Sequence, residues 1–289
     1  MIKHIAIVAP GAMGAALARR LVENGATVST LLEGRSAATR ERAEAAGMQG
    51  VDLDGLAEAE LILSVVPPAE ALALAEKLAP ALARRERKPI YADCNAVDVA
   101  TVQRIAAVIE ATGARFVDGG IIGLPPKPGG KGPTLYFSGP SAGALGFLTP
   151  LGIDAQIIEG AIGAASALKM SYAGITKGIT AVASAMILAA CQAGASDALF
   201  KELEASQPQL LQRFKTSLPD MFPKAYRWVA EMREISSFVG ANPASAALYE
   251  AVAQFYEGMA EDFKGEGKET GLIREFLASS SAGEGGTKV

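Results

Sequence analysis

Short apolar runs alternate with amphipathic segments along the first half of the chain. Strands are predicted at 2–8, 27–32, 61–65, 90–92, 115–118, 134–138 and 154–158, and helices at 13–23, 36–46, 69–83 and 99–112. Strands that alternate with helices in this way form βαβ units, in which helices cover both faces of a parallel sheet. The first half is therefore predicted to be an α/β domain with a doubly wound, mostly parallel sheet.

The pattern changes near residue 160 to almost continuous helix. Glycines and prolines interrupt it near Gly194, Pro208, Pro219, Pro223 and Pro243. We expect a nucleotide-binding domain over 1–159, an all-helical domain over 160–278 and a flexible tail over 279–289, which is rich in Ser and Gly.

The first strand leads into the turn Gly11-Ala12-Met13-Gly14 and then into an alanine-rich helix. Such a turn needs glycine where a Cβ would keep an anion away from the backbone N–H groups, and it is where the pyrophosphate of a dinucleotide is held. These four residues are therefore predicted to bind the cofactor. Because Ala9 stands where the usual pattern has its first glycine, a plain strand and helix joined by a tight turn is the alternative.

The segment after the second strand offers both an acid and a base to the adenosine ribose. Glu33 is placed to accept a hydrogen bond from the 2′-hydroxyl of NAD, whereas Arg35 and Ser36 are donors for the 2′-phosphate of NADP. Gly34 lets the backbone turn there, so we expect NADP to be preferred over NAD. The alternative is a charged loop followed by a solvated helix face.

Two more segments follow apolar strands, at the edge of the sheet that a dinucleotide crosses. Val66 and Pro67 follow one strand, and Asn95 follows another. Val66 and Pro67 are predicted to lie against the cofactor, and Asn95 to bind its carboxamide or a substrate oxygen. A helix cap is the alternative for these positions.

A glycine-rich turn is predicted directly after the strand that ends at Asp118. It contains Gly119, Gly120, Ile122 and Gly123. Backbone N–H groups exposed by such a turn can hold a carboxylate, so these four residues are predicted to bind the substrate.

Lys169 is the sharpest catalytic candidate. It shares one face of a predicted helix with Ser166, Tyr172 and Thr176. A lysine in a cleft can give a proton to a carbonyl oxygen as hydride reaches the carbon, and take it back in the reverse direction. Its ordinary pKa is about 10.4, so action as a base requires burial or a nearby cation such as an oxidised nicotinamide. A helix lysine that reaches solvent is the alternative.

Taken in order, the glycine turn with Met13, the loop ending at Pro67, the glycines after Asp118 and the helix carrying Lys169 resemble the β-hydroxyacid dehydrogenase superfamily. This superfamily includes 6-phosphogluconate and 3-hydroxyisobutyrate dehydrogenases, and the resemblance covers most of residues 1–275. More specifically, the chain looks like a poorly characterised branch with a phosphogluconate-dehydrogenase-like C-terminal domain, whose members favour NADP. The resemblance implies a Rossmann domain, a helical domain that forms a homodimer, hydride transfer between NAD(P) and a hydroxyacid, and Lys169 as the catalytic lysine.

The departures from that superfamily concern the substrate. Ile122 stands where the better-known enzymes have a serine, and Tyr172 stands where they have an asparagine. We expect Tyr172 to act beside Lys169, and Trp228 and Glu231 to form the far wall of the cleft; an amphipathic core helix is the alternative for the last two. A less polar or bulkier substrate is therefore expected. Imine reduction and a non-catalytic NADP-binding redox sensor are the two alternative functions.

Composition narrows the classes of partner. The 289 residues carry a formal net charge of −4, which gives no footprint for nucleic acid or an anionic membrane. Two cysteines and one histidine do not provide the spacing of a metal site, so no metal is expected. The uncharged run 178–196 includes Thr180 and Ser184 and is expected to be a buried helix. We expect a cytoplasmic protein that acts on a small molecule.

Overall fold

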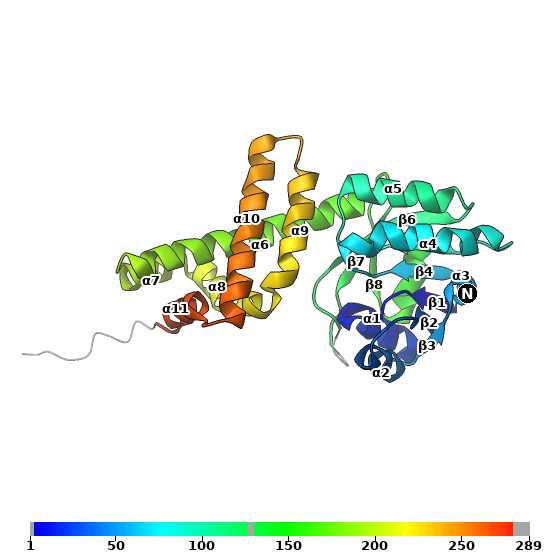
Figure 1. The fold of residues 1–289 in the computed structure, drawn as a ribbon, viewed down its shortest axis with the longest axis horizontal. Helices are drawn as coiled ribbons and strands as arrows, with labels where there is room; N and C mark the ends of the chain where they lie inside the picture. The colour runs from blue at the N-terminus through cyan, green and yellow to red at the C-terminus, as the bar shows by residue number, and fades with distance from the viewer. Residues whose placement is uncertain (1–2, 127–129, 280–289) are drawn as a thin grey trace, which may run out of the picture. The chain divides into compact units, whose positions relative to one another are not determined.

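The computed structural model describes residues 3–126 and 130–279 (Figure 1). Eight strands form a single sheet in the order β3-β2-β1-β4-β5-β6-β7-β8. They are β1 (His4–Ile7), β2 (Thr27–Leu31), β3 (Met48–Val51), β4 (Leu61–Ser64), β5 (Ile90–Asp93), β6 (Arg115–Ile122), β7 (Thr134–Ser138) and β8 (Asp154–Ile157). Every neighbouring pair is parallel except β6 and β7. The predicted doubly wound, mostly parallel sheet is confirmed.

Helices cover both faces of this sheet. They are α1 (Ala12–Glu23), α2 (Ala37–Ala45), α3 (Leu53–Ala57), α4 (Ala71–Arg84) and α5 (Val99–Glu110), with 3-10 turns at Pro68–Glu70 and Ala142–Leu151. Successive residues of β1 point to opposite faces: Ile5 and Ile7 pack with α1, whereas Ala6 and Val8 pack with α4 and α5. Figure 1 shows α4 and α5 side by side over their face. Both faces are buried, which explains why the strands are continuous apolar runs.

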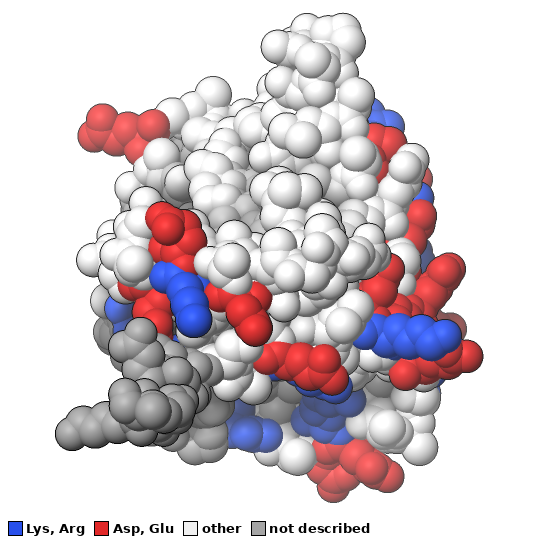
Figure 2. Space-filling model, turned by 90° about the vertical axis from the view of Figure 1, so that its left-hand side faces the viewer, with Lys and Arg blue, Asp and Glu red and all other residues white. Residues whose placement is uncertain are grey.

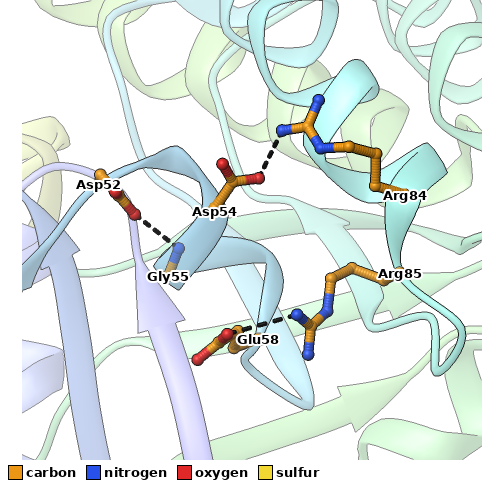
Figure 3. A network of polar contacts seen from close by, with 6 residues as sticks. All are labelled: Asp52, Asp54, Gly55, Glu58, Arg84 and Arg85. Atoms are coloured by element: carbon orange, nitrogen blue, oxygen red, sulfur yellow. Dashed lines mark hydrogen bonds and ion pairs between the residues drawn. The ribbon is translucent and has the colours of Figure 1, made fainter.

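The sequence pattern did not predict β3 or α3. In β3 only Met48 is buried, so its sequence lacks an apolar run. The short α3 begins at Asp52, whose carboxylate accepts a hydrogen bond from the backbone N–H of Gly55. Ion pairs then join α3 to the end of α4, between Asp54 and Arg84 and between Glu58 and Arg85 (Figure 3). These exposed pairs are worth at most about 1 kcal/mol each, so α3 depends on its packing against the sheet.

The second half of the chain is helical, as predicted. Its helices are α6 (Ala164–Gln192), α7 (Ser196–Ser206), α8 (Pro208–Met221), α9 (Ala225–Phe238), α10 (Pro243–Lys264) and α11 (Lys268–Ala278), with a 3-10 turn at Phe222–Lys224. Figure 1 shows α9 and α10 side by side. Of the predicted tail 279–289, residues 280–289 lie outside the described residues.

The chain divides into two compact units, residues 1–171 and 172–289. The division falls inside α6, later than the boundary expected after residue 159, because the first turns of α6 pack on β6. At Gly120 of β6 a Cβ would lie 2.8 Å from the carbonyl oxygen of Ala165 and 3.3 Å from Cβ of Lys169. The start of α6 therefore belongs with the sheet.

Among the described helices, α6 alone is long and apolar enough to cross a membrane. Thr180 and Ser184, two of its polar residues, are buried and donate hydrogen bonds to the carbonyl oxygens of Thr176 and Thr180. The phenol of Tyr256 on α10 donates to the carbonyl oxygen of Lys177 on α6. From residue 172 onward, one side of α6 is therefore packed within the second unit, and the other side is exposed.

Candidate functional site

Four buried polar side chains form a row across one end of the sheet. Ser64 of β4 lies opposite Asp93 of β5, Asp93 opposite Asp118 of β6, and Asp118 opposite Ser138 of β7. None of the four is exposed to solvent. Burial of a carboxylate costs free energy unless hydrogen bonds replace its lost hydration. The hydrogen-bond partners of the two aspartates therefore determine how this part of the sheet is built.

Asp118 fixes the N-terminus of α6. Its Oδ2 accepts hydrogen bonds from the backbone N–H groups of Gly163, Ala165 and Ser166 at 2.9, 2.9 and 3.1 Å, and from the hydroxyl of Ser138 at 2.8 Å. Its Oδ1 accepts a hydrogen bond of 2.6 Å from the hydroxyl of Ser166. A carboxylate at this position satisfies N–H groups that have no partner within the helix and complements the helix dipole. Asp118 therefore anchors the helix that carries Lys169.

The prediction of a turn directly after Asp118 is wrong. The strand β6 continues through Gly119 and Gly120, which pair with Phe137 and Tyr136 of β7, and ends at Ile122. The glycines allow close approach instead: a Cβ on Gly119 would lie 2.8 Å from Sγ of Cys94, and one on Gly120 would meet α6. The partly exposed Ile122 and Gly123, with a φ of 128°, stand at the end of the strand.

Lys169 is partly buried, one turn beyond the residues that Asp118 holds. Burial lowers the pKa of its ammonium, while the neighbouring Cys94 and Asp93 act in the opposite direction. Within the described part of the chain, the ammonium has no hydrogen-bond or ion-pair partner. The alternative of a fully solvated helix lysine therefore does not describe this residue.

The prediction that Ser166 and Thr176 offer free hydroxyls on the same helix face as Lys169 is wrong. The hydroxyl of Ser166 is buried and donates to Asp118, and that of Thr176 donates to the carbonyl oxygen of Tyr172 at 2.8 Å. Both hydroxyls satisfy groups of the protein itself. Tyr172 is 52% exposed and belongs to the second unit.

Asp93 differs from Asp118 in its surroundings. Its oxygens accept hydrogen bonds from the backbone N–H and side-chain amide of Asn95, at 3.1 and 2.8 Å. Burial raises the pKa of Asp93 to about 7; the bonds from Asn95 oppose that shift, the charge of Asp118 adds to it, and the charge of Lys169 opposes it. The carboxyl of Asp93 therefore titrates near neutral pH.

Asn95 is turned into the protein and not toward open space. It is 2% exposed, and its Oδ1 accepts a hydrogen bond of 2.7 Å from the backbone N–H of Val66. Its Nδ2 donates to Ser64 as well as to Asp93. The expected direct contact with a ligand does not fit this orientation, because the amide is already used by the protein. Nor is Asn95 a helix cap, since Asp98 caps α5.

Gly11 and Gly14 have different roles in the glycine turn. A Cβ on Gly14 would lie 2.2 Å from the carbonyl oxygen of Ala9, so this glycine permits α1 to pack against the end of β1. Around Gly11, the N-cap of α1, no described protein atom lies within 4 Å of where a Cβ would stand, and its φ of −66° suits any residue. Ala12 is exposed and Met13 partly exposed. The first turn of α1 has neither an acidic residue nor a side-chain cap, so its N–H groups are available to an anion.

The segment after β2 turns at Gly34, which has a φ of 69°, and enters α2. Ser36 is the N-cap of α2 and accepts a hydrogen bond from the backbone N–H of Thr39. Glu33 is exposed and Arg35 is partly buried. In the part of the chain that the structure covers, the guanidinium of Arg35 makes no hydrogen bond or ion pair, so it can bind a ligand.

Trp228 and Glu231 on α9 are engaged within the second unit. Glu231 forms an ion pair with Lys177, whose Nζ lies 4.9 Å from the centroid of the Trp228 ring. Trp228 also packs edge-on against Tyr256, with the ring centroids 5.3 Å apart. These contacts match the alternative of an amphipathic helix packed into its domain. Their predicted contact with a substrate remains a prediction.

Comparison with known proteins assigns the domains. Residues 4–143 match the family model of the NAD-binding domain of 6-phosphogluconate dehydrogenase. Residues 4–143 therefore form an NAD-binding domain of the 6-phosphogluconate dehydrogenase type. Residues 190–259 match a domain of unknown function (DUF1932), in agreement with the poorly characterised branch indicated by the sequence. An uncharacterised 28.5 kDa protein of Methanothermus fervidus is 28% identical over 215 residues, which is 73% of this chain and 81% of that protein.

Solved structures share the fold across both domains. A conserved protein of unknown function with similarity to 3-hydroxyacid dehydrogenases has a TM-score of 0.73 and 23% identity, and 3-hydroxyisobutyrate dehydrogenase of Mycobacterium tuberculosis has 0.71 and 20%; each comparison covers 96% of this chain and 100% of the other. The imine reductase of Myxococcus stipitatus with NADP+ has a TM-score of 0.54 and 18% identity over 95% of this chain and 99% of the other. A variant of that enzyme holds NAD+, with a TM-score of 0.57 and 17% identity over 96% and 100%. The family model indicates an NAD(P)-binding domain, and solved structures of this fold hold NAD+ in one case and NADP+ in another.

Asp93, Asp118 and Ser138 were not among the residues predicted to form the site. Asp93 and Ser138 end their strands and Asp118 follows the apolar residues Phe116 and Val117 within β6, and a polar residue directly after apolar strand residues is the signal that could have identified them. Their partners come from residues far away in the sequence, such as Ser166, and spacing alone does not show such partners.

Replacement of Asp118 by alanine is expected to lower the free energy of unfolding by about 3–5 kcal/mol, because it leaves several buried N–H and O–H donors without their acceptor. Asp52→Ala is the matched control, since that helix cap is exposed and accepts a single hydrogen bond, and it should cost about 1 kcal/mol. Urea unfolding followed by circular dichroism measures both. Equal, small losses in the two variants would contradict the anchoring role of Asp118.

Proposed function

We propose that the protein is an NADP-dependent oxidoreductase of the cytoplasm that interconverts a small hydroxyacid-like substrate and its carbonyl form. Lys169 carries the proposal. Its ammonium is partly buried, has a lowered pKa and makes no hydrogen bond within the described residues, and it stands on a helix that Asp118 anchors to the NAD-binding domain. A cation in such a position is available to a reacting oxygen atom.

In this proposal Lys169 moves the proton that accompanies hydride transfer. NAD(P), when bound, supplies or accepts the hydride. As a carbonyl carbon gains hydride, its oxygen gains negative charge, and the ammonium of Lys169 gives that oxygen a proton. In the oxidative direction the neutral amine removes the hydroxyl proton. Burial brings the pKa of Lys169 closer to neutral pH, which favours proton transfer in both directions.

The residues of the first unit fit a dinucleotide. The open space at Gly11 and the available N–H groups of α1 suit a pyrophosphate, which would be blocked by a larger residue at position 11. Arg35 would pair with the 2′-phosphate of NADP, and the hydroxyl of Ser36 at the start of α2 would support it. The exposed Glu33 can turn toward solvent when a phosphate is bound.

Replacement of Lys169 by methionine should lower kcat by about 10²–10⁴-fold, because general acid–base catalysis is lost, and leave the Kd of NADPH nearly unchanged. Turnover is followed by nicotinamide absorbance with hydroxyacids, aldehydes, keto acids and cyclic imines, with both cofactors. Lys201→Met is the control, since Lys201 is exposed on α7. An unchanged rate in Lys169→Met would remove Lys169 from the mechanism. Tight NADPH binding by the native protein without turnover of any compound would favour the redox sensor.

Arg35→Ala should weaken NADPH binding by about tenfold or more and leave NADH binding within a factor of about two, since one charge-assisted contact with phosphate is lost. Fluorescence titration of both cofactors measures this. Arg104→Ala on α5, which removes an exposed arginine from another helix, controls for net charge. Equal losses for NADPH and NADH would show that Arg35 does not bind the 2′-phosphate.

We also propose that the protein is a homodimer through its helical unit. Exposed apolar side chains follow one side of α6, at Tyr172, Ile175, Ile179, Val182 and Met186. With residues of α8 and α10, four of them line a groove of about 440 Å³. The face drawn in Figure 2 likewise has a broad central area without Lys, Arg, Asp or Glu. A two-fold axis across α6 would place the same apolar side of two copies together.

Introduction of charge into this groove tests the dimer. Val182→Glu and Met186→Glu should convert the protein to a monomer, because a buried charge without a partner opposes association. Light scattering coupled to size-exclusion chromatography measures the mass. Lys201→Glu is a control on exposed α7 surface outside the groove. A native protein that is monomeric at micromolar concentration would contradict the proposal.

A further inference from the structure

We propose that Asp93 and Asn95 are positioning residues for the cofactor, which hold the segment of Val66 and Pro67 in the conformation that cofactor binding requires. This inference rests on the proposed NAD(P)-dependent function. Neither side chain is placed to contact the cofactor itself, because Asp93 is fully buried and Asn95 is 2% exposed. They act through the backbone of the loop after β4.

The hydrogen bonds between these residues have a fixed direction. The backbone N–H of Val66 can only donate, so the side-chain atom of Asn95 that lies 2.7 Å away must be its oxygen. The amide nitrogen of Asn95 then points at Ser64 and Asp93, to which it donates at 2.9 and 2.8 Å. Asp93 must therefore offer an acceptor at that point. An ionised carboxylate meets this demand with both oxygens, since the second accepts from the backbone N–H of Asn95.

The side chains of Val65 and Val66 pack against the core, and the backbone of the loop is held by hydrogen bonds at its start. The β-ladder between β4 and β5 ends with the hydrogen bond from the N–H of Cys94 to the carbonyl oxygen of Ser64. Beyond that point Pro67 and Pro68 have no N–H group to donate. The bond from Val66 to Asn95 thus attaches the backbone of the loop to the segment that follows β5. Pro67 is exposed next to this attachment, at the sheet edge where a dinucleotide crosses such a fold.

Protonation of Asp93 would disturb this arrangement. A hydrogen on either carboxyl oxygen replaces an acceptor that Asn95 uses, so one hydrogen bond is weakened. The charged or titratable groups that influence Asp93 are Asp118 of β6, Lys169 of α6, and its own neighbours Cys94 and Tyr91 on β5. Since burial raises the pKa of Asp93 to about 7, the carboxyl is partly protonated at neutral pH. Cofactor binding that requires the ionised form should release a proton and strengthen as the pH rises through 7.

Two measurements on the full chain test this inference. The Kd of NADPH, measured by fluorescence titration between pH 6 and 8.5, should rise about tenfold in Asn95→Ala and in Asp93→Asn. The native protein should bind about three- to tenfold more weakly at pH 6 than at pH 8, and Asp93→Asn should lose this dependence because it cannot ionise. Hydrogen exchange of the Val66 amide, measured without cofactor, should be accelerated in Asn95→Ala.

Asn242→Ala is the matched control. Asn242 also accepts backbone hydrogen bonds, from Ala244 and Ser245, but it caps α10 in the other unit. This variant should lose stability without a change in the Kd of NADPH. Asp93→Asn keeps the test valid if Asn95→Ala does not fold, because it nearly conserves volume.

The outcomes separate this inference from the proposed function. A native protein that binds neither NADPH nor NADH would overturn both. Native binding with unchanged Kd values in both variants would overturn the inference alone, as would unaccelerated exchange at Val66 in Asn95→Ala. A pH dependence that persists in Asp93→Asn would likewise show that Asp93 is not the group that couples protons to binding.

Discussion

The carboxylate of Asp118 at the N-terminus of α6 is the contact on which the arrangement of the site depends. It joins β6 to the start of the long helix through three backbone N–H groups and the hydroxyl of Ser166, and it joins β6 to β7 through the hydroxyl of Ser138. This contact fixes where α6 begins and brings Lys169 to the sheet one turn later. Gly120 completes the arrangement, since a Cβ there would force the helix away from β6.

Two neighbouring buried aspartates therefore have different tasks because their donors differ. Asp118 faces a helix N-terminus, whose N–H groups and dipole favour negative charge. Among the described residues, Asp93 receives hydrogen bonds from Asn95, and its burial raises its pKa to about 7. Asp118 therefore anchors a helix, whereas Asp93 is a buried group that gains and loses a proton near neutral pH. The sheet register that places them side by side also couples their charges.

The sequence was sufficient to predict the helices and strands wherever the apolar periodicity is strong. The alternating strands and helices of the first half, the change to helix near residue 160 and the glycine turn were predicted, whereas β3 was missed because only Met48 in it is buried. Gly119 and Gly120 were assigned to a turn because glycine in sequence signals a turn and close packing equally well. Only the positions of Cys94 and Ala165 distinguish the two. Asn95 presents the same difficulty, because an asparagine that binds a ligand and one that holds a loop inside the protein look the same in the sequence.

Side chains that have no partner in the protein are more informative about ligand binding than side chains that already have one. Asn95, Ser166 and Glu231 were all singled out by their chemistry, yet the structure satisfies each of them within the protein. Gly11, Arg35 and Lys169 differ, because in the described residues no protein group needs a glycine at position 11 or pairs with either cation. Since buried and half-buried polar groups normally find partners, positions that lack them in the protein alone are those where a ligand would supply one. All three belong to the first unit, which is also the unit that carries the NAD-binding domain.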